Sequence, residues 1–228
     1  TINNFTHKSK KTYKKKKIVM CVPSTLIYNF KKKLESKSIS LGVQNCHYYQ
    51  NYGPFTGSLN AKMLKGAGAE YIILGHSENR LEGENDKLIK KKIISSLERK
   101  LNIILCIGET LSEKKNNKTF SVLKKQLNNS LIRKFKINKI IIAYEPVWCI
   151  GSNKIPNIKE LTKTIYFIKK EIKKILRTTK SPKVLYGGSV NEKNIRLFSL
   201  ISEIDGFLIG GASQSAKKFI DIVKNYYK

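Results

Sequence analysis

The sequence predicts an α/β protein in which strands and helices alternate, and the number of strand–helix units favours a (β/α)8 barrel. Seven short, continuously apolar runs are spread along the 228 residues, a pattern typical of parallel strands that are buried on both faces. Longer amphipathic stretches lie between them. No change of composition divides the chain, and single barrels commonly reach this length. We therefore expect one barrel domain over residues 18–228, preceded by a basic polar segment over residues 1–17.

The expected strands are too short for independent helices and too apolar for strands with one solvated face. In chain order they are IVMCV (18–22), ISLGVQN (39–45), YIILG (71–75), NIILCIG (102–108), IIIAYE (140–145), KVLYGG (183–188) and DGFLIGG (205–211). A doubly wound sheet usually has fewer units and a G-x-G-x-x-G turn after its first strand. The nearest match, GAGAEY at 66–71, precedes a strand and lacks the third glycine.

Three amphipathic stretches give the clearest helix signals, with apolar residues at a 3.6-residue period. The first, STLIYNFKKKLES, follows the first strand, and Ser24 is its expected N-cap. The others are NDKLIKKKIISSLERK (85–100) and NIKELTKTIYFIKKEIKKIL (157–176). The last repeats its apolar residues at Leu161, Ile165, Ile168, Ile172 and Leu176.

The formal net charge of +29 raises the hypothesis of a polycationic nucleic-acid binder. Only five of the 45 basic residues are arginine, the usual choice for bidentate recognition of phosphates and base edges. The lysines are spread over many segments that are also rich in Asn and Ile. This distribution favours solvated helix faces, and we expect no nucleic-acid partner.

The four cysteines form no C-x-x-C pair, and no apolar run approaches the length of a membrane span. Cys21, Cys46, Cys106 and Cys149 therefore indicate buried thiols in a reducing compartment, with neither a zinc site nor a disulfide framework. We expect no membrane association. Residues 1–17 lack the apolar core of a secretory signal and are either a basic organelle-targeting arm or a polar segment.

Polar residues and glycines follow four of the expected strands, where a barrel carries its active site. His76, Ser77 and Glu78 follow YIILG, and Glu145 follows IIIAY. Glycine pairs end KVLYGG and DGFLIGG, and such turns expose backbone N–H groups that bind anions when they open onto helices. A carboxylate and an imidazole beside a bound phosphate could move protons to and from carbon and oxygen. Alternatively, the histidine is a core residue and the glutamate caps a turn.

Five ordered motifs at these strand ends resemble the triosephosphate isomerase family: ILGHSENR, CIGE, YEPVWCIGSNK, YGGSV and DGFLIGGAS. PFTG at 54–57 is similar to that family's long third loop. The resemblance implies a TIM barrel that interconverts dihydroxyacetone phosphate and glyceraldehyde 3-phosphate through an enediolate, as part of glycolysis and gluconeogenesis. It implies a cytoplasmic homodimer without cofactor or metal, or a plastid-like location if residues 1–17 are a targeting arm. The alternative is a catalytically impaired barrel of the same family that binds a ligand or has a structural role.

The resemblance also implies a role for each matching residue. Glu145 is the base that moves the proton between two substrate carbons, and His76 polarises the carbonyl. Ser77 lies beside the base, and Glu78 is a supporting carboxylate at the floor of the site. Residues 146–154 correspond to a mobile lid. The backbone N–H groups of four further residues would hold the phosphate: Gly151, Ser189, Gly210 and Gly211. The loop that carries Thr56 would dock on a second subunit.

The chain departs from the family pattern in three ways. Asn79 replaces an arginine, so we expect the loss of a charge pair. Asn153 replaces a glycine at the lid tip, a mild change because Asn tolerates a left-handed backbone. From the resemblance we expect the chain to lack the family's first strand, which ends in an Asn-x-Lys triplet with a substrate-binding lysine; NNFTHK (3–8) is only faintly similar. We therefore expect seven of eight units, and residues 1–228 alone to be poorly soluble or inactive.

Overall fold

A computed structural model describes residues 17–34 and 39–226, which form two compact units. One unit contains residues 17–34, 39–75 and 84–104, and the other contains residues 76–83 and 105–226. Apart from Lys17, the predicted N-terminal segment lies outside the described residues, as does NNFTHK. The domain boundary at residue 17 and the absence of a first strand therefore stay predictions.

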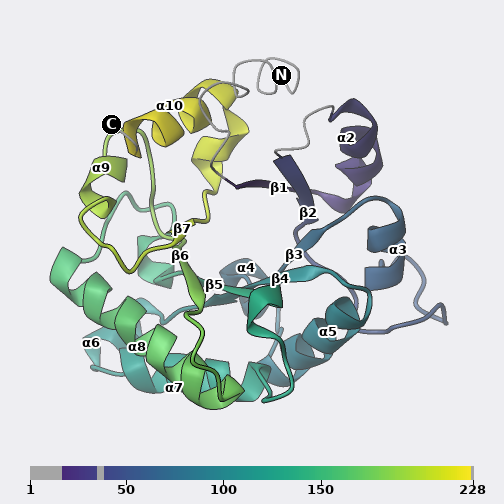
Figure 1. The fold of residues 1–228 in the computed structure, drawn as a ribbon, viewed down its shortest axis with the longest axis horizontal. Helices are drawn as coiled ribbons and strands as arrows, with labels where there is room; N and C mark the ends of the chain where they lie inside the picture. The colour runs from purple at the N-terminus through teal and green to yellow at the C-terminus, as the bar shows by residue number, and fades with distance from the viewer. Residues whose placement is uncertain (1–16, 35–38, 227–228) are drawn as a thin grey trace. The chain divides into compact units, whose positions relative to one another are not determined.

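All seven strands expected from the apolar runs are present (Figure 1). The first unit has the order β1-β2-β3, with β1 parallel to β2 from Ile18 opposite Ile39 to Val22 opposite Val43. The second unit has the parallel order β5-β6-β7. The end of β4 lies beside β5, because Glu145 N–H donates to the Ile107 carbonyl at 2.8 Å. The strands are β1 Ile18–Val22, β2 Ile39–Val43, β3 Tyr71–Leu74, β4 Asn102–Ile107, β5 Ile140–Tyr144, β6 Lys183–Tyr186 and β7 Gly206–Phe207.

The helices of the first unit are η1 Ser24–Leu26, α2 Ile27–Lys33, α3 Ala61–Gly66 and α5 Asp86–Glu98. The predicted N-cap at Ser24 is wrong. Pro23 occupies that position with φ −52° and ψ 142°, and no side chain caps η1. The proline ring fixes φ near this value, so the chain turns into the helix one residue earlier. Helix α5 begins where the sequence predicts, and the Asn85 side chain accepts a hydrogen bond from Leu88 N–H at 3.0 Å.

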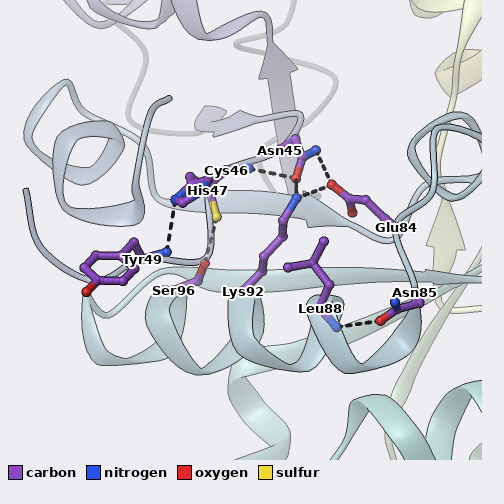
Figure 2. A network of polar contacts seen from close by, with 9 residues as sticks. All are labelled: Asn45, Cys46, His47, Tyr49, Glu84, Asn85, Leu88, Lys92 and Ser96. Carbon is purple, nitrogen blue, oxygen red and sulfur yellow. Dashed lines mark hydrogen bonds and ion pairs between the residues drawn. The ribbon is translucent and has the colours of Figure 1, made fainter. Parts of the chain in front are cut away.

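A buried ion pair joins α5 to the loops around it in the first unit (Figure 2). The Lys92 ammonium contacts the Glu84 carboxylate and lies 3.0 Å from Asn45 Oδ1. Asn45 Nδ2 also donates to Glu84 Oε1 at 2.8 Å. The side chains of Lys92 and Glu84 are only 7% and 12% exposed, so each charge depends on the other for its stabilisation.

Replacing Lys92 with methionine should lower the free energy of unfolding by about 3–5 kcal/mol, because the Glu84 carboxylate would stay buried without its partner. Urea unfolding followed by circular dichroism measures this change. The matched control is Lys87→Met, which removes an exposed lysine from the same helix and should change stability by less than about 0.5 kcal/mol. Equal losses in the two variants would contradict a structural role for the pair.

The second unit contains the long amphipathic helix α8 Ile158–Leu176, whose five predicted apolar residues are all buried. Helix α7 lies beside α8, where the rings of Phe120 and Phe167 are 4.7 Å apart (Figure 1). The other helices are α4 Ser77–Leu81, α6 Leu111–Lys115, α7 Thr119–Ser130, η2 Ile137–Lys139, η3 Val147–Cys149, α9 Ile195–Phe198, η4 Gly211–Gln214 and α10 Ala216–Tyr226. None of the described helices is long and apolar enough to cross a membrane.

Candidate functional site

His76 lies at the start of α4 in the second unit, and its ring is fixed by the helix backbone. Gly75 turns the chain with φ +71° after β3, which places His76 at the N-cap position of α4. Its Nδ1 accepts a hydrogen bond from Glu78 N–H at 3.4 Å. Burial lowers the pKa of His76, with the Glu78 carboxylate opposing the shift. In the neutral ring, an accepting Nδ1 leaves the proton on Nε2.

Glu145 follows β5 and meets this proton. Its Oε1 lies 3.3 Å from His76 Nε2, and its side chain is 4% exposed. Burial raises the pKa of Glu145 to about 8, although the Cys106 thiol, the Ser77 backbone and the Arg80 charge favour the carboxylate. A carboxyl group whose pKa lies near neutrality can take up and release a proton at physiological pH.

Two glycines leave room for Glu145. A Cβ at Gly187 would lie 2.8 Å from Glu145 Cγ, and a Cβ at Gly108 would overlap the Glu145 carbonyl oxygen. Both contacts are closer than real Cβ atoms approach their neighbours. Gly187 therefore places the turn after β6 directly beside the carboxylate. The sequence predicts such proximity, because both residues follow the ends of expected strands.

The raised pKa of Glu145 predicts a pH-dependent difference in stability between the wild type and Glu145→Gln. Unfolding returns the group to an ordinary pKa near 4.5, whereas the folded group ionises near pH 8. Above pH 4.5 the unfolded chain releases this proton and the folded one keeps it, so the wild type loses stability as pH rises to about 8. Glutamine does not ionise. From pH 5 to pH 9, the variant should therefore gain about 3–5 kcal/mol of unfolding free energy relative to the wild type.

Urea unfolding at pH 5, 7 and 9 measures this difference. If His76→Gln alters the pH midpoint of this stability difference, the ionisation involves both residues of the pair, because Nε2 of His76 contacts Glu145. Parallel stability curves for the wild type and Glu145→Gln over this range would contradict the raised pKa.

The four predicted phosphate-binding residues lie in loops of the second unit. Gly151 follows η3, Ser189 follows β6, and Gly210 and Gly211 begin η4 after β7. Within the described part of the chain, their backbone N–H groups donate no hydrogen bond. The sequence predicted that the turn at Ser189 opens directly onto a helix. This prediction is wrong, because α9 begins only at Ile195. The Ser189 carbonyl instead accepts from Asn194 Nδ2 at 3.0 Å.

The loops after β6 and β7 lie close to each other and to Glu145. Leu208 N–H donates to the Tyr186 carbonyl at 3.0 Å. A Cβ at Gly187 would lie 3.5 Å from Leu208 Cβ as well as next to Glu145. The turn that carries Ser189 is therefore adjacent to the carboxylate, and the chain reaches Gly210 two residues after Leu208.

The segment predicted to be a lid, residues 146–154 (the lid segment), is held at its beginning by a buried carboxylate that the sequence analysis did not single out. Glu109 Oε1 accepts a hydrogen bond from Trp148 Nε1 at 2.9 Å, and Tyr144 Oη lies 3.1 Å from Oε2. Glu109 is fully buried, and burial raises its pKa while these two donors lower it. The motif CIGE contains this residue, but its contact with Trp148, 39 positions away, is a property of the fold. Asn153 has a left-handed φ of +57°, a conformation that Asn tolerates better than most residues.

The remaining predicted residues have different surroundings. Ser77 is buried beside Glu145, whereas the Glu78 side chain is 80% exposed, with Oε2 3.6 Å from His76 Nδ1. Thr56 is exposed on a loop of the first unit, in a turn where Gly57 has φ +80°. Asn79 precedes Arg80, whose guanidinium donates to the Cys106 carbonyl at 3.2 Å. No group of three or more metal-binding side chains occurs in residues 17–34 or 39–226.

The chain is similar to known proteins of one family. The family model described as triosephosphate isomerase matches residues 1–226. The triosephosphate isomerase of Thermodesulfovibrio yellowstonii is 41% identical over 195 residues, covering 85% of this chain and 79% of its own. That of Dictyoglomus turgidum is 40% identical over 220 residues, covering 94% and 88%.

The crystal structure of triosephosphate isomerase from Bartonella henselae superposes with a TM-score of 0.85 at 37% sequence identity, covering 93% of this chain and 87% of that one. The sequence relatives and the solved structure cover between 85% and 94% of this chain. The chain belongs to the triosephosphate isomerase family.

Proposed function

We propose that this protein interconverts dihydroxyacetone phosphate and glyceraldehyde 3-phosphate, with Glu145 as the base and His76 as the electrophile. The observation that carries the proposal is the pair itself, in which a buried carboxylate lies 3.3 Å from the Nε2 atom of a histidine whose Nδ1 is already occupied by a backbone N–H. The family and its named relatives support the same reaction.

The two side chains suit the two proton transfers that such an isomerisation needs. Glu145, when ionised, removes a proton from the carbon next to the carbonyl and returns it to the neighbouring carbon. Its pKa of about 8 makes it a stronger base than an ordinary glutamate. The Nε2 proton of neutral His76 donates to the substrate oxygens, where negative charge develops in the enediolate.

The phosphate is proposed to bind the free backbone N–H groups of Gly151, Ser189, Gly210 and Gly211. These groups lie on three loops of the same unit, and the absence of a Cβ at three of the positions lets an anion approach the backbone closely. Gly151 belongs to the lid segment. Binding of the phosphate would therefore draw the lid over the substrate and exclude water from the enediolate.

We further propose a homodimer in which the loop carrying Thr56 contacts a second copy of the chain. The loop is exposed around Thr56, and large aromatic side chains beside it, Tyr49 and Tyr52, are 44% and 64% exposed. A dimer interface would bury such surface. A cytoplasmic location is proposed because Cys21, Cys46, Cys106 and Cys149 are all free thiols, as in proteins of reducing compartments.

The test is a coupled isomerase assay on the purified chain, in both directions, with molecular mass from light scattering. Reaction in deuterated water adds a direct readout, because a base that shuttles the carbon-bound proton exchanges it with solvent. Turnover with deuterium incorporation at carbon supports the proposal. A chain that is folded and binds inorganic phosphate but shows neither turnover nor exchange contradicts it.

A further inference from the structure

Trp148, in the lid segment, is held from two sides by charged groups. At the ring edge, its Nε1 donates to the buried Glu109 carboxylate at 2.9 Å. On the ring face, the Lys114 ammonium lies 4.7 Å from the centroid, within the range of a cation–π interaction. Lys114 comes from α6, so two elements outside the lid fix the orientation of its tryptophan.

Lys114 is itself anchored by an ion pair. Its Nζ lies 2.9 Å from Glu160 Oε2, in the first turn of α8. Helix α8 begins at Ile158, four residues after the lid segment ends. The contacts therefore run from α8 through Lys114 to the indole ring and on to Glu109, and they connect the first part of the lid segment to the helix that follows it.

The beginning of the lid segment forms a tight turn that would transmit a shift of Trp148 to Glu145. Val147 N–H donates to the Glu109 carbonyl at 3.0 Å, and Cys149 N–H donates to the Pro146 carbonyl at 2.8 Å. Only two residues separate Glu145 from Trp148. A displacement of the Trp148 backbone would move this hydrogen-bonded turn, which Glu145 directly precedes in the chain.

We propose that Lys114, anchored by Glu160, is a positioning residue that sets the orientation of Trp148 and through it the placement of the lid and Glu145. The inference rests on the proposed function of Glu145 as the base. Lys114 also balances the two carboxylates around the ring, because its charge lowers the pKa of Glu109, which burial raises. A partly exposed cation over an indole ring shifts an equilibrium by roughly two- to five-fold.

The chain contains a single tryptophan, so tryptophan emission reports on the surroundings of Trp148. Lys114→Gln should change the emission of Trp148 and its response to saturating inorganic phosphate. It should also lower kcat by roughly two- to five-fold with little change in KM. Lys114→Arg, which keeps a cation over the ring, should restore both. Glu160→Gln should act in the same direction but more weakly, and should add nothing in the Lys114→Gln background.

Lys115→Gln is the matched control, because it removes the same charge from the next, exposed position of α6. Raising the salt concentration should move the wild type toward Lys114→Gln, since the Glu160 side chain is 61% exposed and the pair is screened. The proposal is overturned if Trp148 emission and its phosphate response are alike in Lys114→Gln and Lys115→Gln, or if Lys114→Gln changes only the unfolding midpoint. Because fluorescence does not depend on turnover, a chain without isomerase activity would refute the proposed function and still leave this comparison decisive.

Discussion

Replacing Glu145 with glutamine should lower kcat by about 10²- to 10⁴-fold, the range that a positioned general base contributes. The amide has nearly the same shape, so it fits between Gly108 and Gly187, but it cannot accept a proton from carbon. Exchange of the carbon-bound hydrogen with solvent should fall by the same factor as isomerisation, whereas the affinity for inorganic phosphate should change little. Stopped-flow or coupled assays together with mass spectrometry of the product measure both quantities.

The matched control is Glu82→Gln, which neutralises an exposed carboxylate six residues after His76. Its kcat should equal that of the wild type. Turnover in Glu145→Gln within a few-fold of wild type, in a sample free of host isomerase, would remove Glu145 from the proton-transfer step and leave the buried pair without a chemical role.

Replacing His76 with glutamine should lower kcat by about 10²- to 10³-fold, as loss of a donor to a developing oxyanion does. The effect on KM should be much smaller, because the Nε2 proton interacts more strongly with the enediolate than with the ground-state carbonyl. Steady-state kinetics in both directions separates the two constants. The internal control is the affinity for inorganic phosphate, which the proposed function assigns to other loops than the one that carries His76.

A change confined to KM would count against His76 as the electrophile and would indicate a role in substrate binding alone. An equal loss in kcat and in phosphate affinity would point to a collapse of α4, whose N-cap is His76. The variant should therefore be compared with the wild type by circular dichroism before the kinetics are interpreted.

The strands of this protein could be predicted because each is a short apolar run, a local signal that burial on both faces imposes directly on the sequence. The long helices α5 and α8 were predictable for a similar reason, since their buried residues recur every 3.6 positions. The cap at Ser24 failed because Pro23 fixes the backbone one residue earlier. Short helices such as α9 carry too few residues for a period to emerge.

The candidate site residues could be named from the sequence, but only part of their arrangement in space could be predicted. His76 and Glu145 stand at strand ends, and strand ends of parallel sheets converge, so their proximity follows from topology. The hydrogen bond from Trp148 to Glu109 and the buried ion pair of Lys92 with Glu84 depend on side-chain packing between distant segments. A single sequence contains no local pattern that reports such pairs.

The room around Glu145 has a consequence for the gene. Gly108 and Gly187 matter because they have no Cβ atom, since a Cβ at either position would collide with Glu145. Every amino acid change that a single nucleotide substitution can make in a glycine codon introduces a Cβ atom. We therefore expect missense changes at these two codons to impair the protein, although neither residue has a functional group. In a saturation mutagenesis library expressed in cells whose growth depends on this enzyme, the codons of Gly108 and Gly187 should be as strictly constrained as that of His76.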